Sequence, residues 1–436
     1  MAGDGGGPGT VLAALRRGDL AGARVLRFDG WLDAVPPEVF GLAETLEVLD
    51  LGTGPLDALP ADMGRLRRLR VLFCSGHRFT RLPPALGDCE SLSQIGCRGT
   101  GLVEVPGEAL PPRLRWLTLT DNAIAALPDA LGRRPALQKL MLAGNRLAAL
   151  PATLAGVERL ELLRLAANRF DALPPWLADL PGLAWAGWAG NPMDEAPMPA
   201  GTRPVPWRDL VAGPLLGEGA SGRIHGGLWR DIVGGVERPV AIKLFKGAMT
   251  SDGLPEREMA ASLAAGDHPG LVGALGRIAD HPEGRPGLVM RRVPAGWRAL
   301  AGPPSLDSCS RDVWPDGLRL APAVARGIAR TVAEAAAHLH ARNLMHGDLY
   351  AHNILWDGTA GDAVLGDFGA ASTLPDGAAG AAWRRVEVRA FGLLLGELLD
   401  RADGAPAALQ DLARACTGAP RDRPAMADVA RRLAAG

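Results

Sequence analysis

A leucine motif recurs through the first half of the chain with a nearly constant period. Two copies read LEVLDLGTGPLDALP (residues 46–60) and LQKLMLAGNRLAALP (residues 137–151). A weaker copy begins at Ala23, and from there the copies follow at intervals of 22 or 23 residues, at Leu46, Leu69, Leu92, Leu114, Leu137, Leu160 and, in degraded form, Leu183. One such unit is too small to bury its own leucines, so the copies must stack and share one core. The period predicts an array of about eight units over residues 23–191, after a cap over residues 1–22.

The pattern L-x-x-L-x-L-x-x-N-x-L resembles the leucine-rich repeat family. The resemblance implies an α/β solenoid in which each unit contributes one short strand, with a helical cap at residues 11–20. Four turn asparagines are expected to hydrogen-bond the backbone: Asn122, Asn145, Asn168 and Asn191. The strand positions expected on the concave face are Val25, Val48, Val71, Gln94, Trp116, Lys139, Leu162 and Trp185.

Large apolar side chains gather on this expected concave face, at Phe73, Trp116, Met141 and Trp185. Exposed aromatic residues on a curved sheet are typical of protein-binding surfaces, so we expect a protein partner or substrate there. Alternatively, some of these side chains pack sideways against neighbouring strands or against a second domain of the same chain. The sequence leaves both interpretations open.

Composition narrows the partners and the compartment. The formal net charge of −1 provides no bulk attraction to nucleic acid or to an anionic membrane surface. No apolar run reaches the roughly 18 residues of a membrane span, so none is expected. Five cysteines without paired spacing favour a reducing compartment, expected to be the cytoplasm. Cys74 and Cys97 fall at the same repeat position and are predicted to be small core residues.

A change of pattern follows the repeats. Residues 192–206, PMDEAPMPAGTRPVP, contain five prolines and are predicted to be a semi-rigid linker. Next come PLLGEGASGRIHGGLW and RPVAIKLF. The string Gly217-x-Gly219-x-x-Gly222 can also open a dinucleotide-binding fold, but here a β-like run follows and no helix begins at the glycines. A hairpin that forms a flexible lid over phosphates fits better.

With Lys243, Asp348, Asn353 and Asp367 in this order, the second half of the chain resembles the protein kinase family. The resemblance covers residues 207–436. It implies a bilobal kinase-like domain with an N-lobe over about 207–290 and a C-lobe over about 294–436, and it implies ATP and Mg²⁺ as cofactors.

The same resemblance assigns the nucleotide site. Lys243 would contact the α- and β-phosphates and pair with a helix glutamate, for which Glu258 is the best match and Glu256 the runner-up. Met290 takes the gatekeeper position, and the hinge follows at residues 291–293. The complete set of expected ATP-binding residues is Leu216, Gly217, Glu218, Gly219, Ala220, Ser221, Gly222, Ile224, Ala241, Lys243, Glu258, Met290, Arg292, Val293 and Leu355.

The stretch LMHGDLYAHNIL, residues 344–355, matches the catalytic loop of the family. Asp348 would orient or accept the proton of the attacking hydroxyl, and Lys243 and Asn353 complete the expected catalytic set. Asn353 and Asp367 would hold Mg²⁺ against the phosphates. His346 is expected to pack and hydrogen-bond rather than to act as a base. Further on, EVRAFGLLLGELL resembles a helix of the family, with Glu387 replacing Asp.

Three departures from the family pattern stand out. Gly347 replaces the usual Arg that pairs with a phosphorylated activation loop, so loop phosphorylation is expected to matter less. Tyr350 and His352 stand where Ser/Thr kinases carry Lys and Tyr kinases carry Arg, so the acceptor type cannot be read from this loop. The segment after Asp367 is short, lacks an A-P-E motif, and has only Ser372 and Thr373 as hydroxyl candidates for phosphorylation.

Taken together, these motifs favour an active ATP- and Mg²⁺-dependent protein kinase, Ser/Thr rather than Tyr, whose repeats recruit a substrate or regulator. One alternative is a pseudokinase scaffold, motivated by the short activation segment. Another is a small-molecule phosphotransferase, because HGD with Asn five residues after the Asp also resembles aminoglycoside and choline phosphotransferases. The Gly-rich loop, the VAIK strand and the repeats argue against this last alternative.

Overall fold

A computed structural model of the protein describes residues 9–194, 202–219, 221–231, 235–247, 249–250 and 252–435. The chain divides into two compact units, Met1–Gly182 and Leu183–Gly436. Residues 195–201 of the expected linker lie outside the described residues, as does Ala220 of the expected ATP-binding loop. Within the described part, no helix has the length and apolar character needed to cross a bilayer.

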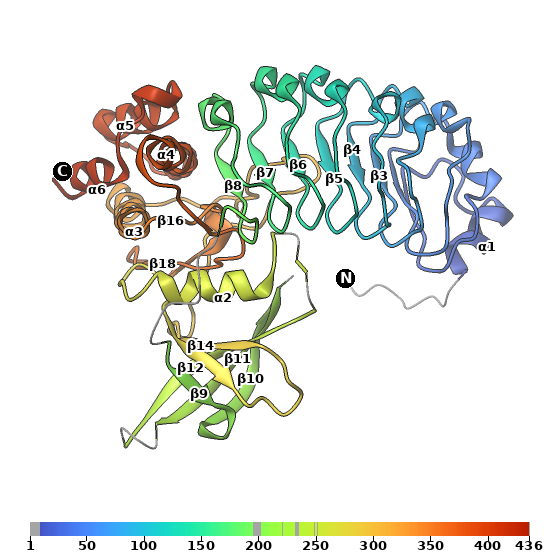
Figure 1. Ribbon diagram of the computed structural model, residues 1–436. Helices are drawn as coiled ribbons and strands as arrows, with labels where there is room; N and C mark the ends of the chain where they lie inside the picture. Colours follow the sequence, from blue (N-terminus) through green and yellow to red (C-terminus); the bar gives the residue numbers. More distant parts are fainter. Residues whose placement is uncertain are drawn as a thin grey trace. The chain divides into compact units, whose positions relative to one another are not determined.

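The first unit is a stack of short parallel strands, one from each repeat, as the sequence predicted (Figure 1). The helix α1 (Thr10–Arg17) precedes them, where a helical cap was expected. The strands are β1 (Val25–Arg27), β2 (Val48–Asp50), β3 (Val71–Phe73), β4 (Gln94–Gly96), β5 (Trp116–Thr118), β6 (Lys139–Met141) and β7 (Leu162–Arg164). From β1 to β7, neighbouring strands pair in register at equivalent residues of their repeats; Trp116, for example, lies opposite Lys139.

Short 3₁₀ turns return the chain between these strands. Several begin directly after the proline that ends a leucine motif, as at Pro128 and Pro151, because a fixed φ suits the start of a helical turn. The turns are η1 (Pro37–Leu42), η2 (Met63–Arg65), η3 (Pro84–Asp88), η4 (Gly107–Ala109), η5 (Asp129–Arg133), η6 (Ala152–Gly156) and η7 (Pro175–Asp179).

The core of this unit is built from the repeated leucines and asparagines. Leu117 and Leu140 are fully buried at the centres of adjacent strands. Asn145 donates through Nδ2 to the carbonyls of Leu119 and Leu142 (2.9 and 3.0 Å), and its Oδ1 accepts from the Ile124 amide. Asn168 repeats this arrangement one unit later. The predicted role of the turn asparagines is thus confirmed, since each satisfies backbone groups that the turn would leave unpaired.

The second unit begins with β8 (Trp185–Gly187), which comes from the last repeat. A mixed sheet follows with the order β10-β11-β12-β14-β13-β9 and the helix α2 beside it (Figure 1). Its elements are β9 (Pro204–Pro206), η8 (Trp207–Asp209), β10 (Leu210–Glu218), β11 (Gly222–Asp231), β12 (Val236–Phe245), α2 (Pro255–Ala264), β13 (Ala274–Ala279) and β14 (Gly287–Arg291). β9 lies within the expected linker and pairs with β13, so the end of that segment is a strand rather than a tether.

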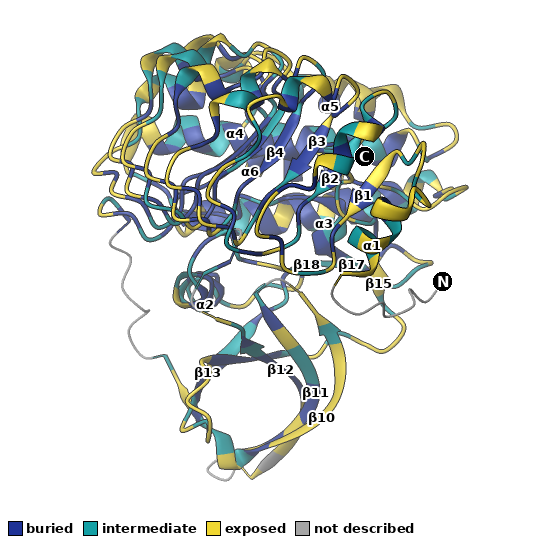
Figure 2. Cartoon of the chain, turned by 90° about the vertical axis from the view of Figure 1, so that its right-hand side faces the viewer, coloured by how far each residue is buried: buried dark blue, intermediate teal, exposed yellow. Residues whose placement is uncertain are grey.

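The rest of the second unit is mainly helical. Figure 2 shows that β10 is largely exposed, whereas α4 carries many buried positions. The elements are β15 (Arg298–Ala299), α3 (Pro322–Ala341), β16 (Leu344–Met345), η9 (Ala351–Asn353), β17 (Ile354–Trp356), β18 (Ala363–Leu365), β19 (Ser372–Thr373), α4 (Gly377–Leu399), α5 (Ala407–Thr417), η10 (Pro420–Asp422) and α6 (Met426–Ala435). The pairing of β16 with β19 joins residues 344–355, named the catalytic stretch below after the loop expected there, to the expected activation segment.

The expected partner surface on the strands is only partly exposed. Phe73 and Trp116 are half-buried, but Trp185 and Met141 are buried (2 % and 8 % exposed), so for these last two residues packing within the chain, the second of the two interpretations, applies. Trp185 is covered because its ring stacks on Tyr350 within the second unit. Met141 lies between strand neighbours on both sides, which corresponds to the sideways packing that the sequence left open.

Candidate active site

A buried ion pair joins β12 to α2. Lys243 on β12 and Glu258 on α2 are 7 % and 3 % exposed, and the ammonium donates to Glu258 Oε1. Glu256, the other candidate for this pairing, is exposed on the same helix. Burial raises the pKa of Glu258; the charge of Lys243 opposes this rise and the charge of Asp367 adds to it. Because either charge would be costly to leave alone at this depth, the pair fixes α2 against the sheet.

The Gly-rich loop connects β10 and β11. A Cβ at Gly217 or Gly219 would meet nothing within 4 Å, so these glycines leave open space above the strand ends. At Gly222 a Cβ would lie 2.5 Å from the Leu244 carbonyl, which makes glycine necessary for the close approach of β12. The carboxylate of Glu218 is bound by Arg223 and Lys246 at the edge of the hairpin. The loop can therefore bring backbone amides close to a phosphate.

An apolar surface suited to a flat base forms next to this loop. Ile224 packs against a cluster that includes Ala241 and Met290, and all three are residues that the sequence analysis expected around adenine. Leu355, half-buried on β17, comes from the other part of the unit. Leu216, by contrast, is 50 % exposed at the end of the hairpin.

Two of the expected hinge residues, Arg292 and Val293, differ in how far they are exposed. Arg292 is exposed. Its guanidinium lies over Gly226 on β11, so close that a Cβ added to this glycine would be 3.4 Å from it. Val293 is half-buried. The two residues directly follow β14, at the point where the chain leaves the sheet.

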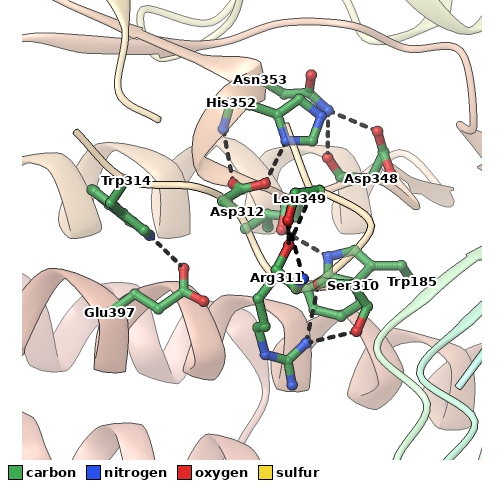
Figure 3. Close-up of polar contacts among 12 residues, drawn as sticks. Trp185, Ser310, Arg311, Asp312, Trp314, Asp348, Leu349, His352, Asn353 and Glu397 are labelled. Carbon is green, nitrogen blue, oxygen red and sulfur yellow. Dashed lines mark hydrogen bonds and ion pairs between the residues drawn. The ribbon is translucent and has the colours of Figure 1, made fainter. Parts of the chain in front are cut away.

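The catalytic stretch places Asp348 and Asn353 in direct contact (Figure 3). Asn353 Nδ2 donates to the Asp348 carbonyl at 2.9 Å and to Asp348 Oδ2 at 2.8 Å. The short turn η9 brings the two residues together although they are five positions apart. Both donors of the carboxamide nitrogen point to Asp348, so the carboxamide oxygen is the part of Asn353 suited to a metal ion.

Asp367 is held in an unusual backbone conformation. Its φ of 58° is left-handed, and Oδ1 accepts from the Gly369 amide at 3.2 Å. The neighbouring His346 is fully buried, hydrogen-bonds the Gly366 carbonyl at 2.9 Å and packs near Phe368, which fits the structural role expected for it. A carboxylate at Asp367 and an amide oxygen at Asn353 match the hard-oxygen ligands that Mg²⁺ prefers, so the residues present fit this ion.

Electrostatic influence links these groups across the site. The charge of Asp367 acts on Glu258 and also on His352, and the charge of Asp348 acts on His352 as well. The expected catalytic and metal-binding carboxylates and the Lys243–Glu258 pair therefore share one electrostatic neighbourhood, even though they come from both parts of the unit.

An acid–imidazole pair beside the catalytic stretch was missed by the sequence analysis. His352 Nδ1 lies 2.7 Å from Asp312 Oδ1, and its backbone amide donates to Asp312 Oδ2 at 3.0 Å (Figure 3). Burial lowers the pKa of His352, but the hydrogen bond to Asp312 and the charges of Asp348, Asp312 and Asp367 outweigh burial and raise it. Asp312 belongs to an irregular segment without periodicity, so no pattern in the sequence indicated this contact.

Glu387 on α4 anchors the start of the catalytic stretch. Oε1 accepts from the Gly347 amide at 2.8 Å and Oε2 lies 2.8 Å from His340 Nε2. Burial raises the pKa of Glu387, but the hydrogen bonds from His340 and the Gly347 amide, together with the charges of His340 and His346, outweigh burial and hold it below its usual range. Glu387, which replaces the Asp of the family pattern, thus ties α4 to the backbone at Gly347.

Two parts of the chain match known families. Residues 210–389 match the family described as protein tyrosine and serine/threonine kinase, and residues 112–170 match the leucine rich repeat family. The first match covers the Gly-rich loop, the buried ion pair and the catalytic stretch. A comparison with curated proteins found no match.

Proposed function

We propose that this chain, in which leucine-rich repeats precede a protein kinase domain, is an active ATP- and Mg²⁺-dependent kinase that phosphorylates Ser or Thr hydroxyls of proteins. One observation carries the proposal: the buried Lys243–Glu258 pair is formed while Asp348 and Asn353 are hydrogen-bonded to each other. Phosphoryl transfer depends mostly on such positioning and on charge neutralisation. A scaffold without catalysis would not require this set of polar groups to be assembled.

Each residue has a defined task in this proposal. Lys243 holds the phosphates by its charge, and Glu258 keeps its ammonium directed into the site. Asp348 accepts the proton of the attacking hydroxyl as the new O–P bond forms and the bond from the γ-phosphorus to the bridging oxygen of ADP breaks. Asn353 Nδ2 keeps the Asp348 carboxylate in position. Mg²⁺, held by Asn353 Oδ1 and Asp367, would neutralise charge on the phosphates.

The acceptor assignment draws support from the single tyrosine of the chain. Tyr350 is 4 % exposed and its ring is stacked, so its hydroxyl is not accessible for autophosphorylation in this conformation. Autophosphorylation is then expected on Ser or Thr. The proposal also includes a protein partner of the repeats, for which Phe73 and Trp116 remain half-exposed. The buried, unbridged cysteines support a reducing compartment such as the cytoplasm.

Lysine labelling tests the nucleotide site with little ambiguity. The chain has three lysines, Lys139, Lys243 and Lys246. An acyl-phosphate derivative of ATP, which transfers its acyl group to an amine near the bound phosphates, should modify Lys243, and free ATP should protect it. Modification of Lys246 alone, or labelling that ATP does not reduce, would contradict the proposed site.

Phosphosite mass spectrometry after incubation with ATP and Mg²⁺ tests catalysis. We expect phosphate on Ser or Thr of the chain itself or of a generic protein acceptor. Asp348→Asn should reduce the rate by roughly 10²- to 10⁴-fold, because the proton acceptor is lost. The control is Asp357→Asn, since Asp357 only binds amides and a hydroxyl in its own turn. Labelling of Lys243 without any phosphate transfer would instead favour a pseudokinase.

A further inference from the structure

The last repeat belongs to the second unit, Leu183–Gly436, which is called the catalytic unit below. Within this unit, Trp185 packs against the catalytic stretch. Its ring stacks on Tyr350 with 4.1 Å between centroids and 8° between planes, and its Nε1–H donates to the Leu349 carbonyl at 3.0 Å. Arg311 lies over the same indole at 5.0 Å (Figure 3). Leu349 and Tyr350 directly follow Asp348, so Trp185 fixes the backbone and the side chain next to the catalytic carboxylate.

The backbone of this repeat lies so close to the catalytic stretch that a Cβ at the contact would clash. Gly347 has a φ of 74°, and a Cβ there would lie 2.5 Å from the Ala186 carbonyl and 2.6 Å from the Ala370 carbonyl. A Cβ at Gly187 would lie 2.8 Å from the Ala370 carbonyl. Only glycine fits between these backbones, which explains why Gly347 occupies the position between His346 and Asp348.

A second tryptophan of the repeat holds the segment that follows Asp367. The Trp188 amide donates to Ser372 Oγ at 2.9 Å, and its Nε1–H donates to the Thr373 carbonyl at 3.2 Å. Its ring lies 4.5 Å from that of Trp383 on α4. Ser372 is 2 % exposed, and its hydroxyl donates to the Ala370 carbonyl. This hydroxyl is engaged and buried, so a kinase cannot reach it unless the contact opens.

We infer that the last repeat, residues 183–194, is a built-in positioning element of the catalytic unit: Trp185 holds the catalytic loop and Trp188 holds the activation segment. The inference rests on the proposed kinase function. In other kinases an added phosphate and its cationic partner hold the activation segment in place. Here the permanent packing of the two tryptophans holds it instead. Trp185 and Trp188 are positioning residues, because they act through Leu349, Tyr350 and Ser372 rather than on the reacting atoms.

The chain contains a matched control for Trp185. Trp116 stands at the same position of its own repeat, as the first residue of β5, but its Nε1–H donates to Thr118 of the same strand. We therefore compare Trp185→Ala with Trp116→Ala in the full chain. Trp185→Phe, which retains an aromatic ring but lacks the N–H donor, serves as a milder variant if Trp185→Ala folds poorly.

Kinetics and hydrogen exchange provide two separate measurements. Trp185→Ala should lower kcat roughly 10- to 100-fold through misplacement of the loop, with little change in the KM for ATP, because the nucleotide-binding strands are untouched. Trp185→Phe should lower kcat less, and Trp116→Ala should leave it unchanged. Amide exchange over residues 346–353 should accelerate in both Trp185 variants relative to Trp116→Ala.

Each other outcome has a defined meaning. Equal kcat and equal exchange in the Trp185 and Trp116 variants would overturn the inference. A higher kcat in Trp185→Ala would overturn it as well, because the repeat would then inhibit the site. If the wild-type protein transfers no phosphate, the proposed function fails, but the exchange comparison still decides whether Trp185 orders the catalytic loop.

Discussion

Trp116 and Trp185 occupy the same position in their repeats but have different surroundings. Trp116 is half-buried, bonds within its own strand and carries Lys139 over its ring at 4.0 Å. Trp185 is buried, bonds the catalytic stretch and stacks on Tyr350. The repeat pattern predicts a strand at both positions, and both residues begin one. The neighbours that each side chain meets decide whether it serves the repeat array or the catalytic unit.

The largest expected effect comes from closing the space between the repeat backbone and the catalytic stretch. Gly347→Ala adds the usual cost of a left-handed residue, roughly 1–2 kcal/mol, and a clash with the Ala186 and Ala370 carbonyls. Because the clash adds to the backbone strain, Gly347→Ala should lose more stability than strain alone would cause. We also expect kcat to fall about 100-fold, since the clash displaces the catalytic stretch.

Gly101→Ala is the control for this substitution. Gly101 also has a positive φ, 85°, but a Cβ there meets nothing within 4 Å. Denaturant unfolding and steady-state kinetics should show only the strain cost for Gly101→Ala, with kcat unchanged. If both variants lose the same stability, the close approach to Ala186 is not a constraint.

An intermediate effect is expected from two turn asparagines. Asn168 Nδ2 donates to the Leu142 and Leu165 carbonyls, and Asn191 Nδ2 donates to the Trp188 carbonyl at 2.7 Å. Replacing either by Ala removes hydrogen bonds to buried backbone carbonyls and should cost about 1–3 kcal/mol. Only Asn191→Ala should also lower kcat, by about 3- to 10-fold, because it loosens Trp188. Unfolding and kcat measured on the same preparations test this, and a similar loss of kcat in Asn168→Ala would contradict the distinction.

The smallest expected effect is on how the stability of the catalytic unit depends on pH. Burial raises the pKa of Glu397 to about 7; the hydrogen bond from Trp314 opposes this and the charge of Asp312 adds to it. Between the ordinary glutamate pKa and 7, the folded protein retains a proton that the unfolded chain releases, so stability falls as pH rises through this window. Glu397→Gln, which keeps the acceptor for Trp314, should remove this fall.

Thermal unfolding at pH 5 and pH 8 measures this fall in stability. The wild-type Tm should drop by about 2–5 °C more than that of Glu397→Gln. Glu334→Gln, at an exposed position on α3, is the control and should behave like the wild type. An equal drop in Tm for wild type and Glu397→Gln would show that this carboxyl does not titrate in the window.

The sequence predicted the parts of the molecule that depend on local pattern. Trp116 and Lys139 were expected as strand residues and begin β5 and β6, because a strict period sets both strand and register. The pairing of Lys243 with Glu258 was expected from the family resemblance and is formed.

Contacts between distant segments could not be predicted in the same way. The leucine pattern around Trp185 is degraded, but it gives no sign of which segment that side chain meets, so the sequence did not distinguish the half-buried Trp116 from the buried Trp185. Asp312 reaches His352 across 40 positions from a segment with no period. β9 forms from a proline-rich segment because its edge position in the sheet tolerates proline. These features arise from tertiary packing, which overrides local signals.

The most direct test of the account is the time course of phosphate transfer by the full chain after treatment with a phosphatase and its removal. If the last repeat already orders the catalytic loop and the activation segment, transfer from ATP to a protein acceptor should be linear from the first measured point. A lag that shortens as the chain phosphorylates itself, or no transfer until it does so, would contradict the account.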